Sequence, residues 1–590
     1  MRDILRQIWR FLRIAVTGPG SGLSLLLLLF VIGCQFAVIQ VNVRSIQWYA
    51  DFYNALQKLD VPVIVAQIGV FFALAAAAAG LYLVGRYARK VLQIRWRRRL
   101  TRTLVDAWTS RKAFWLLGPV LAGDKAIDNP DQRIAEDCIM FCEFILGRDE
   151  GSRSGVLDFV MNLVGLYTYA TLLWQLSTFA LPFNAIGIDY ELPRYMFWIA
   201  PVYVAIAMAL THSLGHPLSG LLAEEQKREA DFRSALIHVR ENAAAVALLN
   251  GETAERRLLS QRFEDVVSIW FQVIRREFIF GLFQRPYFQT VLRVPIFIAL
   301  PAFLAGKITL GGLMQLATSF QQVVTNLSWF VFNYKFLSDL VATTRRMQRF
   351  LDAMQSVPAE PAGPRRLAPA ANPDLRIAGL VIRAPDGRTL LDIGELTVRR
   401  GQTVWLSGAS GLGKSTLFKT LAGLWPHADG TIELPDARIC VLPQQVYLPL
   451  DVLTGSAIYP ALPDGLSRVD VEALLRTVGL GHRLGVEMET TSGLSVGEQQ
   501  RLALARVLAS KPDWILLDEA TSALDHDSER KLMSQLRTEL PDATFVVVAH
   551  REPQGLPNVV KIELSNGRMN NVTVNAEGTF RGNLAATARV

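Results

Sequence analysis

The chain has 590 residues, of which 51% are hydrophobic and 19% are charged, and its mean hydropathy is +0.25. A single core rarely grows to this length, and soluble proteins are rarely so apolar, so we expect several domains, one of them in a membrane. The net charge of +8 is compatible with nucleic acid, but basic residues cluster directly after an apolar run, between Arg86 and Lys112. Cytoplasmic loops of membrane proteins collect Lys and Arg in this way. The pattern therefore favours a lipid bilayer, and not nucleic acid, as the partner.

The beginning of the chain allows two interpretations. A basic start, an apolar stretch and Val31-Ile32-Gly33-Cys34 resemble a lipoprotein cleavage site. However, the uncharged run continues to Val43, which is longer than the apolar region of a signal peptide. We therefore expect Cys34 to lie inside the first membrane helix. The four cysteines show no paired CxxC spacing, which indicates reduced packing residues and neither disulfides nor a metal site.

Apolar segments free of charge, or nearly so, recur through residues 1–350 and predict a transmembrane domain. A spanning helix needs ~20 predominantly apolar residues. The basic N-terminus and the Arg86–Lys112 cluster lie on the cytoplasmic side, and an even number of spans returns the chain to that side. Six spans are expected, near residues 22–43, 62–85, 156–177, 195–215, 284–304 and 312–334.

Two long polar segments separate these spans, at residues 86–147 and 218–276. Unstructured loops of that length are uncommon, so we expect helices that extend into the cytoplasm, turn and return. The connections on the other side are expected to be short, the first of them at residues 45–60. Arg293 lies within the fifth span, where a charge is costly unless it faces protein or water. It either lines a wet cavity or reaches the cytoplasmic headgroups.

A linker rich in Pro and Ala follows at residues 351–374, and from residue 375 short β-like runs alternate with helical ones. This alternation predicts a soluble α/β domain at residues 375–590. The expected fold is therefore a membrane α-helical bundle of six helices with long cytoplasmic extensions, followed by an α/β domain.

A glycine-rich turn between a β-like run and a helical run carries the strongest chemical signal. Its backbone N–H groups can surround phosphate oxygens, its lysine can reach the terminal phosphates, and the serine after it can bind magnesium. The pattern predicts binding of a nucleoside triphosphate with Mg²⁺. The turn consists of Gly408, Ala409, Ser410, Gly411, Leu412, Gly413, Lys414, Ser415 and Thr416.

Further motifs follow in a fixed order. They are Leu442-Pro443-Gln444-Gln445, Leu494-Ser495-Val496-Gly497-Glu498-Gln499-Gln500-Arg501, Trp514-Ile515-Leu516-Leu517-Asp518-Glu519-Ala520-Thr521, Ser522-Ala523-Leu524-Asp525 and Val548-Ala549-His550-Arg551. Together with the glycine-rich turn they resemble the nucleotide-binding domain of ABC transporters, which implies an α/β P-loop ATPase domain with ATP and Mg²⁺ as its ligands.

Asp518 ends an apolar strand, where its carboxylate can hold magnesium through water, and Glu519 can orient or deprotonate the attacking water. The resemblance implies that Gln444 senses magnesium and that water, that His550 contacts the γ-phosphate, and that Asp525 communicates across a dimer. One chain supplies one phosphate loop and one signature segment, whereas two nucleotides need two of each. A two-fold homodimer is therefore expected.

The chain departs from the family pattern at two places. In the signature segment Ser495 and Gly497 are retained, but Val496 replaces a glycine and Glu498 stands where Gln is usual. The segment is still expected to meet the γ-phosphate of a second copy through its helix N-terminus. The aromatic residue that often stacks on adenine is replaced by Ala384, so another contact would hold the base.

Two stretches suggest a branch of the family. Residues 127–137 resemble the peroxisomal fatty-acid half-transporters and their bacterial relatives, and residues 192–198 resemble the BacA-like peptide-uptake permeases. The resemblance implies an ATP-driven transporter of the cytoplasmic (inner) membrane, with the ATPase in the cytoplasm. Its expected activity is uptake of hydrophilic peptides or cobalamin-like compounds. The alternatives are an exporter of lipid or fatty-acyl cargo and an ATP-gated regulator or pore.

Overall fold

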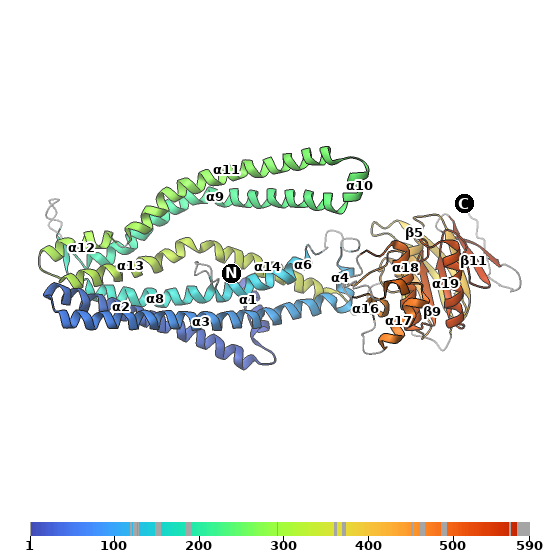
Figure 1. Cartoon of the computed structure of the whole chain (residues 1–590), viewed down its shortest axis with the longest axis horizontal. Helices are drawn as coiled ribbons and strands as arrows, with labels where there is room; N and C mark the ends of the chain where they lie inside the picture. The colour runs from blue at the N-terminus through green and yellow to red at the C-terminus, as the bar shows by residue number, and fades with distance from the viewer. Residues whose placement is uncertain are drawn as a thin grey trace. The chain divides into compact units, whose positions relative to one another are not determined.

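The structure is a computed structural model, and contacts between residues divide it into two compact units (Figure 1). The first unit is Met1–Ala107 with Asp128–Asp352, and the second is Trp108–Ile127 with Ala353–Val590. The structure describes residues 2–118, 121, 127, 129–147, 155–182, 191–291, 293–358, 363–367, 373–449, 452–460, 467–484, 493–565 and 568–574.

The first unit is built of helices, several of them much longer than a bilayer is thick. They are α1 (Arg2–Val16), α2 (Ser21–Lys58), α3 (Val61–Thr109), α6 (Pro130–Gln132), α7 (Cys138–Leu146), α8 (Val156–Leu176), α9 (Tyr195–Glu241), α10 (Ala243–Leu248), α11 (Glu252–Thr290), α12 (Val294–Leu304), α13 (Leu310–Phe332) and α14 (Tyr334–Ser356). A π-helical turn, Arg133–Asp137, joins α6 to α7. A short antiparallel pair, β1 (Ala180–Pro182) and β2 (Glu191–Pro193), lies between α8 and α9.

Four helical segments of the described chain are long and apolar enough to cross a membrane: Ser21–Lys58, Val61–Leu116, Val156–Leu176 and Tyr195–Leu214. They coincide with the first four predicted spans, and Cys34 is buried inside the first of them. The predicted connection at residues 45–60 is wrong for most of its length, because α2 continues as a helix to Lys58. Trp48 stacks on Phe52 there, as aromatic residues at a membrane boundary do.

The fifth predicted span is interrupted. Helix α11 ends at Thr290 and α12 begins at Val294, after Arg293 at its N-cap position. Prolines explain the interruption, since Pro295 has no N–H to continue the helical ladder. Helix α12 has only 11 residues and is therefore shorter than the first four spans. Helix α13 carries several Gln, Ser and Thr residues and is therefore less apolar than those spans. The total of six spans therefore remains a prediction.

The predicted cytoplasmic extensions are helical. Helices α9 and α11 pack side by side beyond the predicted spans, joined by α10, and together leave the remaining helices of the unit (Figure 1). Phe232 and Phe263, whose ring centroids are 5.5 Å apart, join the two helices. In the first extension, α3 runs without a break to Thr109.

A buried carboxylate joins three of the membrane helices. Asp158 of α8 accepts hydrogen bonds from Arg89 Nη2 of α3 at 3.1 Å and from Gln35 Nε2 of α2 at 3.2 Å. Because Asp158 is buried, its charge is stabilised by the guanidinium and the amide and not by water. The pair connects the start of the third predicted span to the basic cluster after the second.

The second unit contains a mixed sheet of ten described strands, in the order β3-β7-β4-β5-β12-β11-β6-β10-β9-β8. Strands β6, β8, β9, β10 and β11 form a parallel set, and β4 is antiparallel to β5 and β7. The strands are β3 (Arg365–Leu367), β4 (Leu375–Arg383), β5 (Thr389–Val398), β6 (Thr403–Gly408), β7 (Ala428–Glu433), β8 (Ile439–Leu442), β9 (Trp514–Asp518), β10 (Thr544–Val548), β11 (Val559–Ser565) and β12 (Arg568–Val574).

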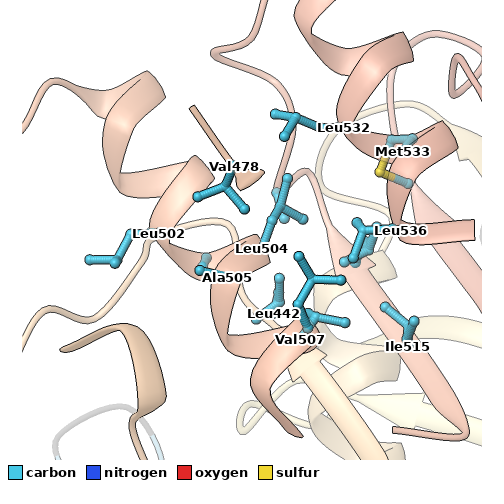
Figure 2. Close-up of a cluster of buried hydrophobic side chains, with 14 of the residues drawn as sticks. Leu442, Val478, Leu502, Leu504, Ala505, Val507, Ile515, Leu532, Met533 and Leu536 are labelled. Carbon is cyan, nitrogen blue, oxygen red and sulfur yellow. The ribbon is translucent and has the colours of Figure 1, made fainter. Parts of the chain in front are cut away.

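Helices cover the parallel strands. They are α15 (Lys414–Leu421), α16 (Leu453–Ile458), α17 (Arg468–Thr477), α18 (Val496–Ser510) and α19 (His526–Glu539). Figure 2 shows the core between them, where Leu504 and Val507 of α18 and Leu536 of α19 lie with Leu442 and Ile515 of the sheet. Strands β9 and β10 are buried at every position, as expected of central parallel strands.

The tip of the first cytoplasmic extension belongs to this second unit. Its short helix α4 (Ala113–Leu116) places Trp115 so that its Nε1 donates a hydrogen bond to the Leu424 carbonyl at 2.8 Å. The ammonium of Lys419 lies 5.5 Å from the centre of the Trp115 ring, a cation–π geometry. Both Leu424 and Lys419 follow the phosphate loop closely in the chain, so this tip contacts the ATPase near its nucleotide-binding helix.

Candidate nucleotide-binding and hydrolysis site

The glycine-rich turn lies between β6, which ends at Gly408, and α15, which begins at Lys414. Two of its glycines have no space for a side chain. A Cβ at Gly408 would lie 2.6 Å from the Leu564 carbonyl oxygen, and one at Gly413, whose φ is +84°, would lie 3.2 Å from Leu390 Cβ. The backbone therefore adopts a curve that other residues disfavour, and its N–H groups converge at the helix N-terminus, where anions bind.

Lys414 lies inside the curve of this turn. Its Nζ donates to the carbonyl oxygens of Gly408 at 2.6 Å and Ala409 at 2.8 Å, and the residue is buried. A cation held within a ring of backbone donors creates a positive site for phosphate oxygens.

The next residue, Ser415, donates a hydrogen bond from its Oγ to Oδ1 of Asp518, at the end of β9, at 3.0 Å. Burial raises the pKa of the Asp518 carboxyl, the Ser415 hydrogen bond opposes this rise, and the neighbouring charge of Glu519 adds to it. A hydroxyl oxygen and a carboxylate oxygen are the ligands that Mg²⁺ prefers. Because burial destabilises the ionised form of the Asp518 carboxylate, a cation beside it would stabilise that form. Ser415 and Asp518 therefore fit a magnesium ion.

Glu519 is held by three contacts. Its Oε2 accepts from Gln444 Nε2 at 2.8 Å, and its Oε1 lies 3.0 Å from His550 Nε2. Its backbone has a φ of +51°, and its N–H donates to the Val548 carbonyl at 2.9 Å. A non-glycine residue in this left-handed region is strained, and such strain gathers at functional sites. Gln444 and His550 therefore both contact Glu519, so the three residues that the sequence predicts to be catalytic lie together.

The signature residues form a second group, at the N-terminus of α18. Ser495 caps this helix by accepting a hydrogen bond from the Glu498 N–H. A Cβ at Gly497 would lie 3.4 Å from the Ala523 carbonyl, so the helix passes close to the segment that ends at Asp525. Asp525 in turn caps α19 by accepting from the Ser528 N–H at 2.9 Å, and these backbone donors lower the pKa of Asp525.

Comparison with known proteins gives two family matches that correspond to the two units. Residues 11–304 match ABC transporter transmembrane region 2, and residues 391–522 match the ABC transporter family. The inner membrane ABC transporter ATP-binding protein YddA of Escherichia coli (strain K12) is 31% identical over 90% of this chain and 92% of its own length. The chain belongs to the ABC transporter family.

This ABC transporter is also similar, at lower identity, to members of the D subfamily. The chloroplastic ABC transporter D family member 2 of Arabidopsis thaliana is 27% identical over 85% of this chain and 78% of its own. The ATP-binding cassette sub-family D member 3 of Mus musculus is 25% identical over 79% and 73%. The fold matches a bacterial Atm1-family ABC exporter with ATP bound, with a TM-score of 0.69, 18% identity, and coverage of 92% of this chain and 94% of that one.

As an ABC transporter of the half-transporter type, the chain lies in a membrane, binds ATP in its second unit and couples ATP hydrolysis to movement of a solute. The site geometry adds residues to which the sequence motifs gave no role. Gln500 of α18 donates to Ser522 Oγ at 3.2 Å and accepts from the Ala523 N–H at 2.9 Å. Arg551, next to His550, donates from its Nη2 to the Leu524 carbonyl at 2.9 Å.

These two side chains tie the signature helix and the His550 loop to the segment around Asp525. Both occur within the quoted motifs, so the motifs located them, but their partners are brought close only by the fold. Arg483 is different, because it lies outside every motif and nonetheless contacts Glu498. A search of the sequence for a basic partner of Glu498 would have returned many other arginines besides Arg483.

Ala384 does not present an empty stacking surface. It is buried, and it accepts a hydrogen bond from the Gly387 N–H at 2.9 Å and donates to the Arg388 carbonyl at 2.8 Å. It therefore forms one corner of the turn between β4 and β5. An aromatic side chain at this position would overpack the turn, so Ala384 has a structural role in the turn.

Proposed function

We propose that two copies of this chain form an ATP-driven exporter of the cytoplasmic membrane that expels lipid-like or fatty-acyl solutes. The single observation that carries the direction of transport is the fold, which is shared over almost the whole chain with a bacterial exporter. Uptake of peptides or cobalamin-like compounds, expected from residues 192–198, receives no support from the relatives compared. Export, the alternative given by the sequence, agrees better with them.

The nature of the cargo rests on residues 127–137 and on the D-subfamily relatives. The resemblance of this stretch to fatty-acid half-transporters favours an amphipathic solute. Residues 130–137 of the stretch form α6 and the π-helical turn.

In the proposed cycle, the turn at residues 408–416 holds the phosphates, and Lys414 neutralises part of their charge. Ser415 and Asp518 would hold Mg²⁺, which supplies charge neutralisation on the phosphate oxygens when it is bound. Glu519 orients the attacking water and accepts its proton, while Gln444 and His550 hold the carboxylate. This intact cluster supports turnover over the third possibility, an ATP-gated pore without stoichiometric pumping.

A homodimer is supported by the paired helices α9 and α11. They leave the rest of their unit, and the tip between them carries Leu248 and Leu249, which are 84% and 81% exposed. Exposed apolar side chains at the tip of a helical hairpin indicate a protein contact. We propose that this contact is with a second copy, which also supplies the signature segment for each nucleotide.

Inverted and right-side-out membrane vesicles test the direction of transport. With ATP on the cytoplasmic face, we expect a fluorescent long-chain fatty acid to accumulate inside inverted vesicles that contain the wild-type protein. Vesicles with Lys414→Ala, which lacks the charge aimed at the phosphates, should show no accumulation. ATP-dependent movement of a labelled hydrophilic peptide out of inverted vesicles, with no movement of the fatty acid, would establish uptake instead.

A further inference from the structure

The carboxylate of Glu498, in the first turn of α18, is enclosed by donors from two segments. Arg483 binds it with both sides of its guanidinium group, Nε donating to Oε1 at 2.8 Å and Nη2 to Oε2 at 3.0 Å. His482 Nε2 lies 3.1 Å from Oε1. Both basic residues come from the short 3₁₀ helix Gly481–Arg483, so a segment outside the signature compensates the charge within it.

The same carboxylate is tied to the signature serine. Oε2 accepts from the Ser495 N–H at 2.8 Å and from Ser495 Oγ at 2.9 Å, while the Glu498 N–H donates back to Ser495 Oγ at 3.3 Å. The position of Ser495 therefore depends on the position of Glu498. The Arg483 guanidinium, followed by the Ser495 N–H, holds the pKa of the Glu498 carboxyl far below its usual range, so the group is ionised at neutral pH.

An ionised glutamate at this place has two opposing effects. It stabilises the helix, because a negative charge in the first turn interacts well with the helix dipole. It also cancels the positive potential that a helix N-terminus offers to a phosphate, which a neutral glutamine would not do. A bidentate arginine removes this conflict, since it balances the charge and fixes the orientation of the carboxylate.

We propose that Arg483 is a positioning residue for nucleotide closure, which keeps the signature segment electrostatically suited to the γ-phosphate and Ser495 correctly oriented. The inference rests on the proposed function, in which the signature segment of one copy meets the nucleotide bound by the other. Arg483 acts through Glu498 and Ser495. It follows that the chain needs Arg483 because it carries glutamate, and that it would need no arginine with glutamine at position 498.

The test uses the full-length transporter in lipid nanodiscs with three variants: Arg483→Gln, Glu498→Gln and the double variant. Arg483→Gln leaves the carboxylate without its main partner, and we expect kcat for ATP hydrolysis to fall about 10- to 100-fold, the range for losing hydrogen bonds to a charged group. Binding of a fluorescent ATP analogue should change little, because the phosphate loop is intact. Glu498→Gln alone should lower kcat much less than Arg483→Gln does, and the double variant should recover most of the loss seen in Arg483→Gln.

Arg476→Gln is the matched control, since Arg476 pairs with Glu472 on the exposed face of α17 at 3.4 Å, and it should leave kcat unchanged. Loss of activity in Arg483→Gln that Glu498→Gln does not restore would overturn the proposal, because charge compensation would then not be the cause. A fall in melting temperature large enough to explain the lost activity, equal in the single and double variants, would likewise show a purely structural role.

Failure of the underlying dimer is detected separately. In the Glu519→Gln background, two signature segments closing on two nucleotides should retain labelled ATP through gel filtration. If that variant with Arg483 intact retains no ATP, the proposed nucleotide sandwich is wrong. If it retains ATP and Arg483→Gln in the same background also retains it fully, the sandwich stands and the role of Arg483 is refuted.

Discussion

At the scale of single residues, the hydrolysis site depends on a strained position. Glu519 follows the buried strand β9 directly and has a φ of +51°, a conformation that costs on the order of 1–3 kcal/mol for a non-glycine residue. The hydrogen bond from its N–H to Val548, in the neighbouring strand β10, holds it there. The strain turns the carboxylate toward Gln444 and His550, instead of continuing the line of the strand.

Glu519→Gln should bind ATP normally and hydrolyse it about 10²- to 10⁴-fold more slowly, because the base that accepts the proton of water is lost. The amide keeps the size of the side chain and can still contact Gln444 and His550. Phosphate release and binding of a fluorescent ATP analogue, measured on the same preparation, check both parts. Turnover near the wild-type rate would mean that another carboxylate is the base.

At the scale of elements, side-chain ion pairs join the last helix of the membrane unit to the first cytoplasmic extension. Asp137, at the end of the π-helical turn, accepts from Arg346 of α14 through Nη2 at 2.6 Å and Nε at 3.0 Å. Arg133 donates to the same carboxylate at 3.1 Å. The pKa of Arg346 is raised, first because of the hydrogen bond with Asp137. Helix α14 is the last helix of its unit, so in the chain it directly precedes the second unit.

Asp137→Asn should destabilise the protein by about 1.5–3 kcal/mol, the range for hydrogen bonds to charged groups, because two arginines lose their shared anion. Asp352→Asn is the matched control. Asp352 pairs with Arg10 at 3.0 Å, but the side chains of Asp352 and Arg10 are 56% and 35% exposed, so the loss should stay within about 0–1 kcal/mol. Thermal unfolding in detergent compares the two, and equal shifts in melting temperature would show that burial of Asp137 does not strengthen its pairs.

The break between α11 and α12 is the second feature at this scale. Arg293 donates from Nη1 to the Gln289 carbonyl at 3.2 Å and is exposed. With ~1.5 Å per residue, the 11 residues of α12 place Arg293 about 16 Å from the outer end of that helix. This is about half of a ~30 Å hydrocarbon layer, where a charge needs water or a protein partner.

We propose that Arg293 lines the wet cavity and does not reach the headgroups. Arg293→Leu should then impair transport and leave basal ATP hydrolysis largely intact, because the change would remove a polar group from the pathway and none from the ATPase. A cysteine at position 293 should react with a charged, membrane-impermeant thiol reagent in one state of the nucleotide cycle. Proteoliposome transport and labelling check the two expectations. Full transport by the leucine variant, with complete protection of the cysteine in every state, would exclude contact with cargo.

At the scale of the whole molecule, the exposed tip of the α9–α11 pair is the surface that a second copy would cover. Replacing both Leu248 and Leu249 with Asp should weaken the dimer and lower ATP hydrolysis, because the charges would have to be desolvated on contact. Light scattering in detergent, corrected for bound detergent, measures the mass against the 65.6 kDa of one chain. An unchanged dimer mass together with unchanged ATPase activity would place the dimer contact elsewhere.

The sequence by itself determined the organisation of the chain and most of the candidate nucleotide site. The phosphate loop, Asp518 and Glu519 were predictable because each is local: a strand, a few residues and a helix create the geometry without help from distant parts. The first four spans were predictable for the same reason, since a helix satisfies its own backbone hydrogen bonds in lipid. The break at Arg293 was not predictable, although the prolines beside it were visible. An apolar run does not show at which residue a helix is interrupted.

Tertiary structure alone decided which charges meet. Gln444 and His550 lie far from Glu519 in the chain and contact it because parallel strands bring their ends to one edge of the sheet. Arg89 and Asp158, or Arg483 and Glu498, were only charged residues in a sequence with many of them. Electrostatic pairing depends on distance and burial in space, not on separation along the chain, so these contacts became visible only once the helices and strands were packed.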